Sequence, residues 1–116
     1  MSKSSTTIKQ DASRIGSLKI RPVHPGEILA EELQELELSA NALAQALGVP
    51  ANRISDILRE RRSLTADTAL RLARYFGTTP TLWLNLQQNY DLALAEQSSG
   101  AVINKTVRPR KQTIAA

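Results

Sequence analysis

The polar residues best suited to hydrogen bonding with an external partner lie in one short stretch of the sequence, residues 51–62. Asn52 and Arg53 stand near its start, and arginines occupy positions 53, 59, 61 and 62. Asn side chains form paired hydrogen bonds with adenine, and Arg side chains do so with guanine and with phosphate. The stretch could therefore bind nucleic acid, although on charge alone an ordinary solvated surface explains the four arginines equally well.

Residues for covalent, metal or acid–base chemistry are scarce. The chain has no cysteine, which excludes a disulfide scaffold, a thiolate zinc site and a cysteine nucleophile. His24 is the single histidine, which excludes metal sites built from several histidines. No Ser, Asp or Glu has the spacing of a catalytic triad with His24, and no glycine-rich phosphate loop is present. We therefore expect a protein that is not an enzyme and that uses no metal and no cofactor.

The net charge of the 116-residue chain is +4, but this charge is unevenly distributed. Residues 25–97 carry a net charge of −4, while residues 1–24 and 98–116 carry +4 each. A high overall charge therefore says little about nucleic-acid binding here, because the positive balance comes from the two ends. A prediction of nucleic-acid binding has to rest on the local arrangement of residues instead.

Helical periodicity dominates the middle of the chain. The composition, 41% hydrophobic and only 3% aromatic, argues against β-sandwiches and barrels, whose strands favour aromatic and β-branched residues. No segment of five or more residues alternates cleanly between apolar and polar, as a half-buried strand does. The sequence instead predicts an all-α domain over residues 20–97, with five helices at about residues 25–37, 40–47, 51–59, 66–76 and 80–97.

Residues typical of helix ends stand at the boundaries of these segments. Ser39, Thr65 and Thr79 suit the N-cap, because a hydroxyl oxygen there accepts a hydrogen bond from a free N–H of the first turn. Gly48 and Gly77 stand just past two predicted helix ends, where a left-handed residue commonly closes a helix. The boundaries of the middle helices are therefore well defined.

The two ends of the chain have a different composition. Residues 1–19 and 98–116 are polar and basic, and Ser98, Ser99 and Gly100 interrupt the preceding pattern. We expect both segments to be flexible arms. The N-terminal segment lacks the apolar core of a signal peptide, and the longest apolar runs are far too short to span a membrane. These features favour a cytoplasmic protein.

The second and third predicted helices form a helix-turn-helix at about residues 40–59. They are short, and the three residues that join them, at positions 48–50, match the length and composition of the turn in that motif. Ala44 is small enough for close helix packing, and Gly48 can take the positive φ of the turn. The apolar residues that would fix the angle between the helices are Leu43, Leu47, Val49, Ile54 and Ile57. Together these features predict a DNA-binding motif.

The exposed face of the third helix would then enter the major groove of DNA and read base edges. The residues expected to do so are Ala51, Asn52, Arg53, Ser55 and Asp56. Asp56 could accept from cytosine, or it could orient Arg53 or Arg59 one turn away. The residues expected to bind phosphate are Asn41, Gln45, Arg59, Arg61 and Arg62.

Five segments carry a family resemblance. They are residues 21–29 (RPVHPGEIL), 44–49 (AQALGV), 61–73 (RRSLTADTALRLA), 76–80 (FGTTP) and 83–87 (WLNLQ). With them, about two thirds of the chain resembles the lambda-repressor/Cro-like (XRE) family, and within it the HigA-type antitoxins. The resemblance implies a five-helix, dimeric, operator-binding repressor of its own operon that neutralises a HigB-like mRNA interferase toxin. A plain XRE-family regulator without a toxin partner is the alternative.

Two further surfaces are candidates for protein contacts. A stripe on the last helix comprises Trp83, Leu86, Tyr90, Ala93 and Leu94. For Trp83, closing the protein's own core is as good an explanation, whereas the distal part of the stripe better suits a two-fold dimer interface. The first helix is acidic, and Glu27, Glu31, Glu32 and Glu35 form either a solvated face or a docking surface for the basic toxin.

Overall fold

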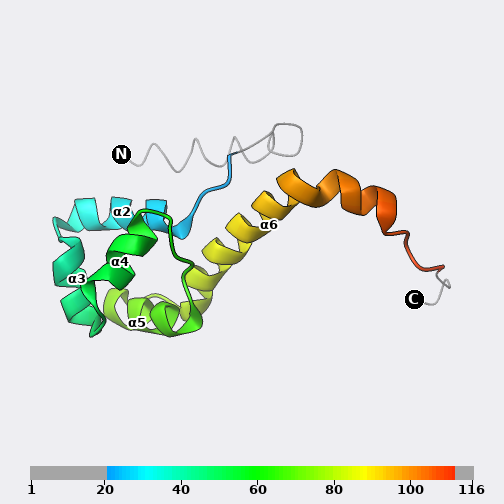
Figure 1. Ribbon diagram of the computed structural model, residues 1–116. Coiled ribbons are helices and arrows are strands. Elements are labelled where there is room, and N and C mark those ends of the chain that lie inside the picture. The colour runs from blue at the N-terminus through cyan, green and yellow to red at the C-terminus, as the bar shows by residue number, and fades with distance from the viewer. Residues whose placement is uncertain (1–20, 112–116) are drawn as a thin grey trace, which may run out of the picture.

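The computed structural model describes residues 21–111 and contains five helices and no strand within that range. The helices are α2 (Pro25–Leu36), α3 (Ala40–Leu47), α4 (Ala51–Leu58), α5 (Ala66–Phe76) and α6 (Pro80–Thr106). The predicted all-α, five-helix fold is confirmed. The helices α2 to α5 and the first part of α6 pack into one body, from which the rest of α6 projects (Figure 1).

The predicted helix boundaries are formed by the side chains expected there. Ser39, Thr65 and Thr79 are N-caps, and the hydroxyl of each accepts a hydrogen bond from the backbone N–H three residues further on. Gly48 and Gly77 end α3 and α5 in the left-handed conformation, with φ of 73° and 76°. Each of these signals acts within a few residues of sequence. The residue types at these positions were therefore enough to predict the helix ends.

The start of α2 depends on His24, whose role had no clear signal in the sequence. His24 is the N-cap, and its Nδ1 accepts a hydrogen bond from the backbone N–H of Gly26 at 2.8 Å. The imidazole is buried and meets the ring of Tyr90 edge-on, with 4.8 Å between ring centroids. The histidine therefore caps α2 and packs it against α6.

Gly26 lies where α2 comes closest to α4. A Cβ atom at this position would overlap the backbone carbonyl oxygen of Ile57, the next-to-last residue of α4. Only a residue without a side chain allows the two backbones to lie this close. Gly26 therefore fixes how α4 is seated on the body of the domain.

The core lies between α2, α3, α4, α5 and the first turns of α6. Of the five apolar residues predicted to fix the helix-turn-helix angle, four are buried and Val49 is partly buried against them. Ala44 is also buried, as its small size suggested. The buried hydrophobic cluster comprises Leu29, Leu33, Leu43, Ala44, Leu47, Ile54, Ile57, Leu64, Ala69, Leu72, Ala73 and Trp83.

Gln87 is a buried polar residue that ties α6 to the loop after α4. Its Oε1 accepts a hydrogen bond from the backbone N–H of Leu64 at 2.7 Å, and its Nε2 donates to Asp91 at 3.0 Å. Leu64 belongs to the connection between α4 and α5. The glutamine therefore holds in place the segment that follows the helix-turn-helix.

We expect Gln87→Ala to lower the free energy of unfolding by about 1–3 kcal/mol, because it leaves the buried N–H of Leu64 without its acceptor. Urea denaturation followed by circular dichroism measures the change. The neighbouring Gln88→Ala is the matched control, because Gln88 is exposed and its loss should change stability by less than about 0.5 kcal/mol. Equal effects of the two substitutions would contradict the structural role of Gln87.

The predicted end of the last helix is wrong. That prediction ended the helix at about Gln97, but α6 continues without a break through Ser98, Ser99 and Gly100 to Thr106. A glycine inside a helix costs only about 1 kcal/mol relative to alanine, and the helix-forming residues on both sides offset it. Residues 98–106 are therefore helical, not part of a flexible tail.

Two other predictions about the ends concern residues that the structure does not describe. The arm at residues 1–19 lies outside the described range, as do the last residues of the C-terminal arm, 112–116.

Within residues 21–111, no helix combines the length and apolar composition needed to cross a membrane. Within the same range, His, Asp and Glu side chains form no group of three or more that could hold a metal ion.

Candidate nucleic-acid interface

The turn between α3 and α4 is held by hydrogen bonds to the end of α3. The N–H of Gly48 donates to the carbonyl of Gln45 at 3.1 Å, and the N–H of Val49 donates to that of Ala44 at 3.0 Å. Pro50 then acts as the N-cap of α4. This arrangement ends one helix and starts the next within three residues, as a helix-turn-helix requires.

The helix α4 turns its apolar side inward and a polar side outward. Ile54 and Ile57 are completely buried, while Ala51 and Asn52 at the N-terminal end are exposed. Arg53, Ser55 and Asp56 are half-buried at the edges of the outward side. All five residues predicted to read bases are therefore at least partly exposed on α4.

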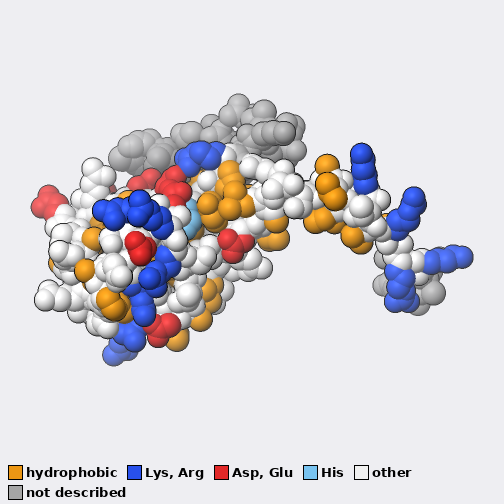
Figure 2. Space-filling model, viewed as in Figure 1, with side chains coloured by type: hydrophobic (Ala, Val, Ile, Leu, Met, Phe, Trp, Pro, Cys, Tyr) orange, Lys and Arg blue, Asp and Glu red, His pale blue; other side chains and the backbone are white. Residues whose placement is uncertain are grey.

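The arginines after α4 extend this outward side. Arg59, Arg61 and Arg62 are exposed, and the chain turns between them at Glu60, which has a positive φ of 62°. Figure 2 shows basic side chains gathered over this part of the domain, with acidic side chains among them. Such a surface suits the phosphates that flank a groove.

Asp56 has a different neighbour from either of the two considered in the sequence analysis. Its Oδ2 lies 3.8 Å from Nη2 of Arg62, and no ion pair joins it to Arg53 or Arg59 within the described residues. The suggestion that Asp56 orients Arg53 or Arg59 is therefore wrong. A role in accepting from cytosine stays a prediction.

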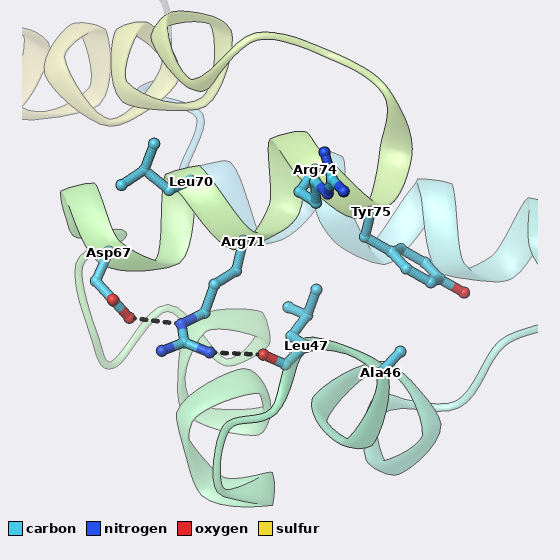
Figure 3. Close-up of a pocket in the computed structure, with 7 residues that line it drawn as sticks. All are labelled: Ala46, Leu47, Asp67, Leu70, Arg71, Arg74 and Tyr75. Carbon is cyan, nitrogen blue, oxygen red and sulfur yellow. Dashed lines mark hydrogen bonds and ion pairs between the residues drawn. The ribbon is translucent and has the colours of Figure 1, made fainter.

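The partner of Arg53 is Asp67, in the first turn of α5. Nη1 of Arg53 donates to Oδ2 of Asp67 at 2.8 Å, and Nε of Arg71 donates to the same oxygen at 2.9 Å. Arg71 also donates from Nη1 to the carbonyl of Leu47 at 2.8 Å (Figure 3). These hydrogen bonds link the end of α3, the outward side of α4 and the start of α5.

Of the residues in this cluster, only Arg53 was predicted from the sequence to have a role at the interface. The pair Asp67 and Arg71 has the four-residue spacing of a helical ion pair and could have been found. The contact of Asp67 with Arg53 joins residues fourteen positions apart on different helices, and no local pattern indicates it.

The charge of Asp67 is stabilised by its two arginines. The hydrogen bond and charge of Arg71, followed by the hydrogen bond and charge of Arg53, hold the pKa of this carboxyl below its usual value. The pKa of Asp67 is lower in the folded state than in the unfolded state. The contacts of Asp67 with the two arginines therefore stabilise the fold at neutral pH, and this stabilisation is lost as the pH falls below about 4. The carboxylate is therefore charged wherever the protein would meet DNA.

The remaining predicted phosphate ligands lie on α3. Asn41 is in the first turn of that helix, and Gln45 is one turn further on. Both side chains are exposed. The helix N-terminus beside Asn41 carries a partial positive charge, which favours a nearby phosphate.

The acidic side of α2 divides into two parts. Glu31, Glu32 and Glu35 are exposed and line a shallow groove on that helix. Glu27 instead forms an ion pair with Arg21, whose hydrogen bond lowers the pKa of the Glu27 carboxyl. Of the four predicted docking residues, three therefore present unpaired charge within the described part of the chain.

The stripe on α6 divides in a similar way. Trp83 is only 4% exposed, and its Nε1 donates to Thr78 at 2.9 Å, so this residue belongs to the core of its own chain. Leu86 packs against the same core, and Tyr90 packs against His24. Ala93 is half-buried and Leu94 is exposed, so the outward-facing part of the stripe begins only there.

Comparison with known proteins agrees with this architecture. A family model described as "Helix-turn-helix" matches residues 29–84. Virulence-associated protein I of Dichelobacter nodosus is 53% identical over 88 residues, which are 75% of this chain and 82% of that protein. The solved structure of an addiction module antidote protein of the HigA family from Coxiella burnetii is 59% identical, with a TM-score of 0.77, over 78% of this chain and 100% of that one.

A second solved structure includes DNA. It is described as the Pseudomonas aeruginosa antitoxin HigA with the higBA promoter, and it is 48% identical with a TM-score of 0.76 over 78% of this chain and 100% of that one. The fold and these matches define a helix-turn-helix protein of the XRE type. Within that class, the chain belongs to the HigA antitoxin family.

Proposed function

We propose that this protein is the antitoxin of a toxin–antitoxin module, and that it binds operator DNA as a dimeric repressor of its own operon. The observation that carries the DNA-binding part is the arrangement of α4. Ile54 and Ile57 are completely buried, while Asn52 is exposed and Arg53 is half-buried near the N-terminal end of the helix, just after the turn. A relative of the same fold has been solved with the promoter of its operon, which supports the same use here.

In this proposal α4 enters the major groove with its N-terminal end nearest the bases. Asn52 pairs with adenine, Arg53 with guanine, and Ala51 contacts a thymine methyl group. Ser55 and Asp56 make the remaining base contacts. The residues that bind phosphate and hold the register are Asn41, Gln45, Arg59, Arg61 and Arg62.

The dimer forms through the outer part of α6. Leu92 and Ile103 are exposed apolar side chains that line one groove, on a length of helix that lies away from the body of the domain (Figure 1). A second copy of the helix would remove them from water. A two-fold dimer sets two α4 helices about 34 Å apart, so the operator is palindromic.

The toxin binds the acidic side of α2, through Glu31, Glu32 and Glu35. A HigB-like mRNA interferase has to bind RNA and therefore carries a basic surface, which complementary charge would attract. An mRNA interferase acts on RNA in the cytoplasm. We therefore assign its antitoxin, this chain, to the cytoplasm as well.

Arg53→Ala tests base reading. We expect the substitution to cost about 1–3 kcal/mol in binding to the cognate operator and to relax the preference at one base pair. The measurement is the affinity for the operator and for single-base variants of it, at fixed salt. Equal loss for cognate and scrambled duplexes would make Arg53 a phosphate contact instead.

Arg62→Ala is the matched arginine control. It should weaken binding to all duplexes alike and reduce the dependence of log affinity on log salt by about one. An unchanged salt dependence would remove Arg62 from the interface.

The antitoxin part is tested by growth. The small open reading frame next to this gene is expressed with and without this protein in the same cell. Growth that stops with the neighbour alone and recovers on co-expression supports the proposal. A harmless neighbour would instead favour a plain transcriptional regulator with the same DNA-binding surface.

A further inference from the structure

We propose that Asp67 is a positioning residue for operator recognition, and that it holds the guanidinium group of Arg53 in the orientation that reads one base pair. This inference rests on the proposed DNA binding through α4. It assigns a role to a residue of α5, which lies outside the helix-turn-helix itself.

The carboxylate of Asp67 is held in place by Arg71, independently of its contact with Arg53. Nη1 of Arg71 donates to the carbonyl of Leu47 at 2.8 Å, and Nε of Arg71 donates to Oδ2 of Asp67 at 2.9 Å. The carbonyl belongs to the last residue of α3. Asp67 is therefore anchored to the frame of the helix-turn-helix through Arg71, as Figure 3 shows.

The anchored carboxylate leaves Arg53 able to bind DNA. Only Nη1 of Arg53 is used by Asp67, at 2.8 Å, and a guanidinium group has five N–H donors. The side chain keeps 29% of its surface exposed, beside the outward side of α4. The remaining donors can still form a bidentate pair with the O6 and N7 atoms of guanine.

Holding Arg53 in advance should improve discrimination between bases. A free arginine side chain has many rotamers, and fixing one of them on binding opposes association. A hydrogen bond to a fixed carboxylate removes most of this freedom before DNA arrives. It also restricts the directions in which the remaining donors point, so a wrong base leaves them unpaired.

Charge agrees with this role. Arg53 and Arg71 share one carboxylate, so the cluster keeps a net positive charge toward DNA. The two arginines also hold the pKa of Asp67 below its usual value, so the acceptor stays ionised at neutral pH. Asp56, the acidic residue on α4 itself, pairs with Arg62 and does not take the place of Asp67 as the partner of Arg53.

The experiment uses a duplex that the wild-type protein selects from a random library, and a set of duplexes that each carry one substituted base pair. Asp67→Ala should reduce the preference for the base pair read by Arg53 by up to about tenfold, with a smaller loss for Asp67→Asn. In the Arg53→Ala background, Asp67→Ala should cause no further loss of preference. Glu96→Ala removes an exposed acidic charge from α6 and controls for the general gain of affinity that follows from a less acidic protein.

The outcomes separate the inference from the function on which it rests. Unchanged base preference in Asp67→Ala, or the same loss in the Arg53→Ala background, would overturn the inference and leave DNA binding intact. A uniform fall in affinity for all duplexes, with a lower melting temperature, would make Asp67 purely structural. If the wild-type protein enriches no sequence, operator binding itself is wrong, and the inference is wrong with it.

Discussion

Gly26→Ala is expected to lower the free energy of unfolding by about 3 kcal/mol, the upper end of the usual effect of overpacking. The added methyl group would overlap the carbonyl oxygen of Ile57. That oxygen belongs to the backbone of α4, so relief requires a movement of the whole helix and not of one side chain. Because α4 is the proposed recognition helix, operator affinity should fall together with stability.

Gly100→Ala is the matched control for this substitution. Gly100 is also a helical glycine, but a Cβ atom there would meet only the flexible side chain of Glu96, at an ordinary contact distance of 3.4 Å. Alanine should therefore be neutral or stabilise α6 by up to about 1 kcal/mol. Denaturant unfolding of both variants measures the contrast, and a Gly26→Ala protein as stable as the wild type would show that α2 and α4 do not approach so closely.

Leu72→Ala is expected to have the second large effect, a loss of about 2–5 kcal/mol in the free energy of unfolding. Leu72 lies in α5 and is completely buried in the single core of the domain. Alanine would leave a cavity among side chains that come from several helices. A loss of this size is a large part of the roughly 5–15 kcal/mol that stabilises a small domain.

Leu70→Ala provides the same chemical change two residues earlier on the same helix. Leu70 is 59% exposed and, with Tyr75, lines a groove formed by residues of α3 and α5 (Figure 3). Its loss should change stability by less than about 0.5 kcal/mol. Thermal unfolding at matched concentration compares the two variants, and similar melting temperatures would contradict the assignment of Leu72 to the core.

Much of the fold was predictable because its signals are local. A hydroxyl at Ser39 or Thr65 acts on an N–H only three residues away, and the left-handed turn at Gly48 needs only the absence of a side chain. Apolar spacing then gave the buried side of α4 correctly. The helix-turn-helix could therefore be predicted almost entirely from the sequence.

The contacts between helices were not predictable in the same way. Gly26 meets Ile57, and Gln87 meets Leu64, across long separations in sequence. Periodicity shows which side of a helix is apolar, but it does not show which residue of another helix that side meets. The hydrogen bond between Arg53 and Asp67 was unpredictable from the sequence for the same reason.

The last helix shows a different limit. Serine and glycine residues in a row resemble a helix end, but their combined helix propensity is only weakly unfavourable, and the flanking residues decide. On the same helix, Trp83 lies in the core because the chain turns at Thr78 and Pro80 and brings α6 back against α5. A spacing pattern on one helix could not distinguish that arrangement from an interface.

The projecting part of α6 also gives the molecule two regions of very different local stability. Beyond Tyr90 no residue of the described chain is buried, so the backbone hydrogen bonds there are sheltered only by the helix itself. In an isolated protomer, the amide hydrogens of this part should exchange with solvent through local unfolding, long before those near Gln87 do. A second copy lying along the helix would slow that exchange, so the exchange rate of these amides reports directly on whether the protomer is alone.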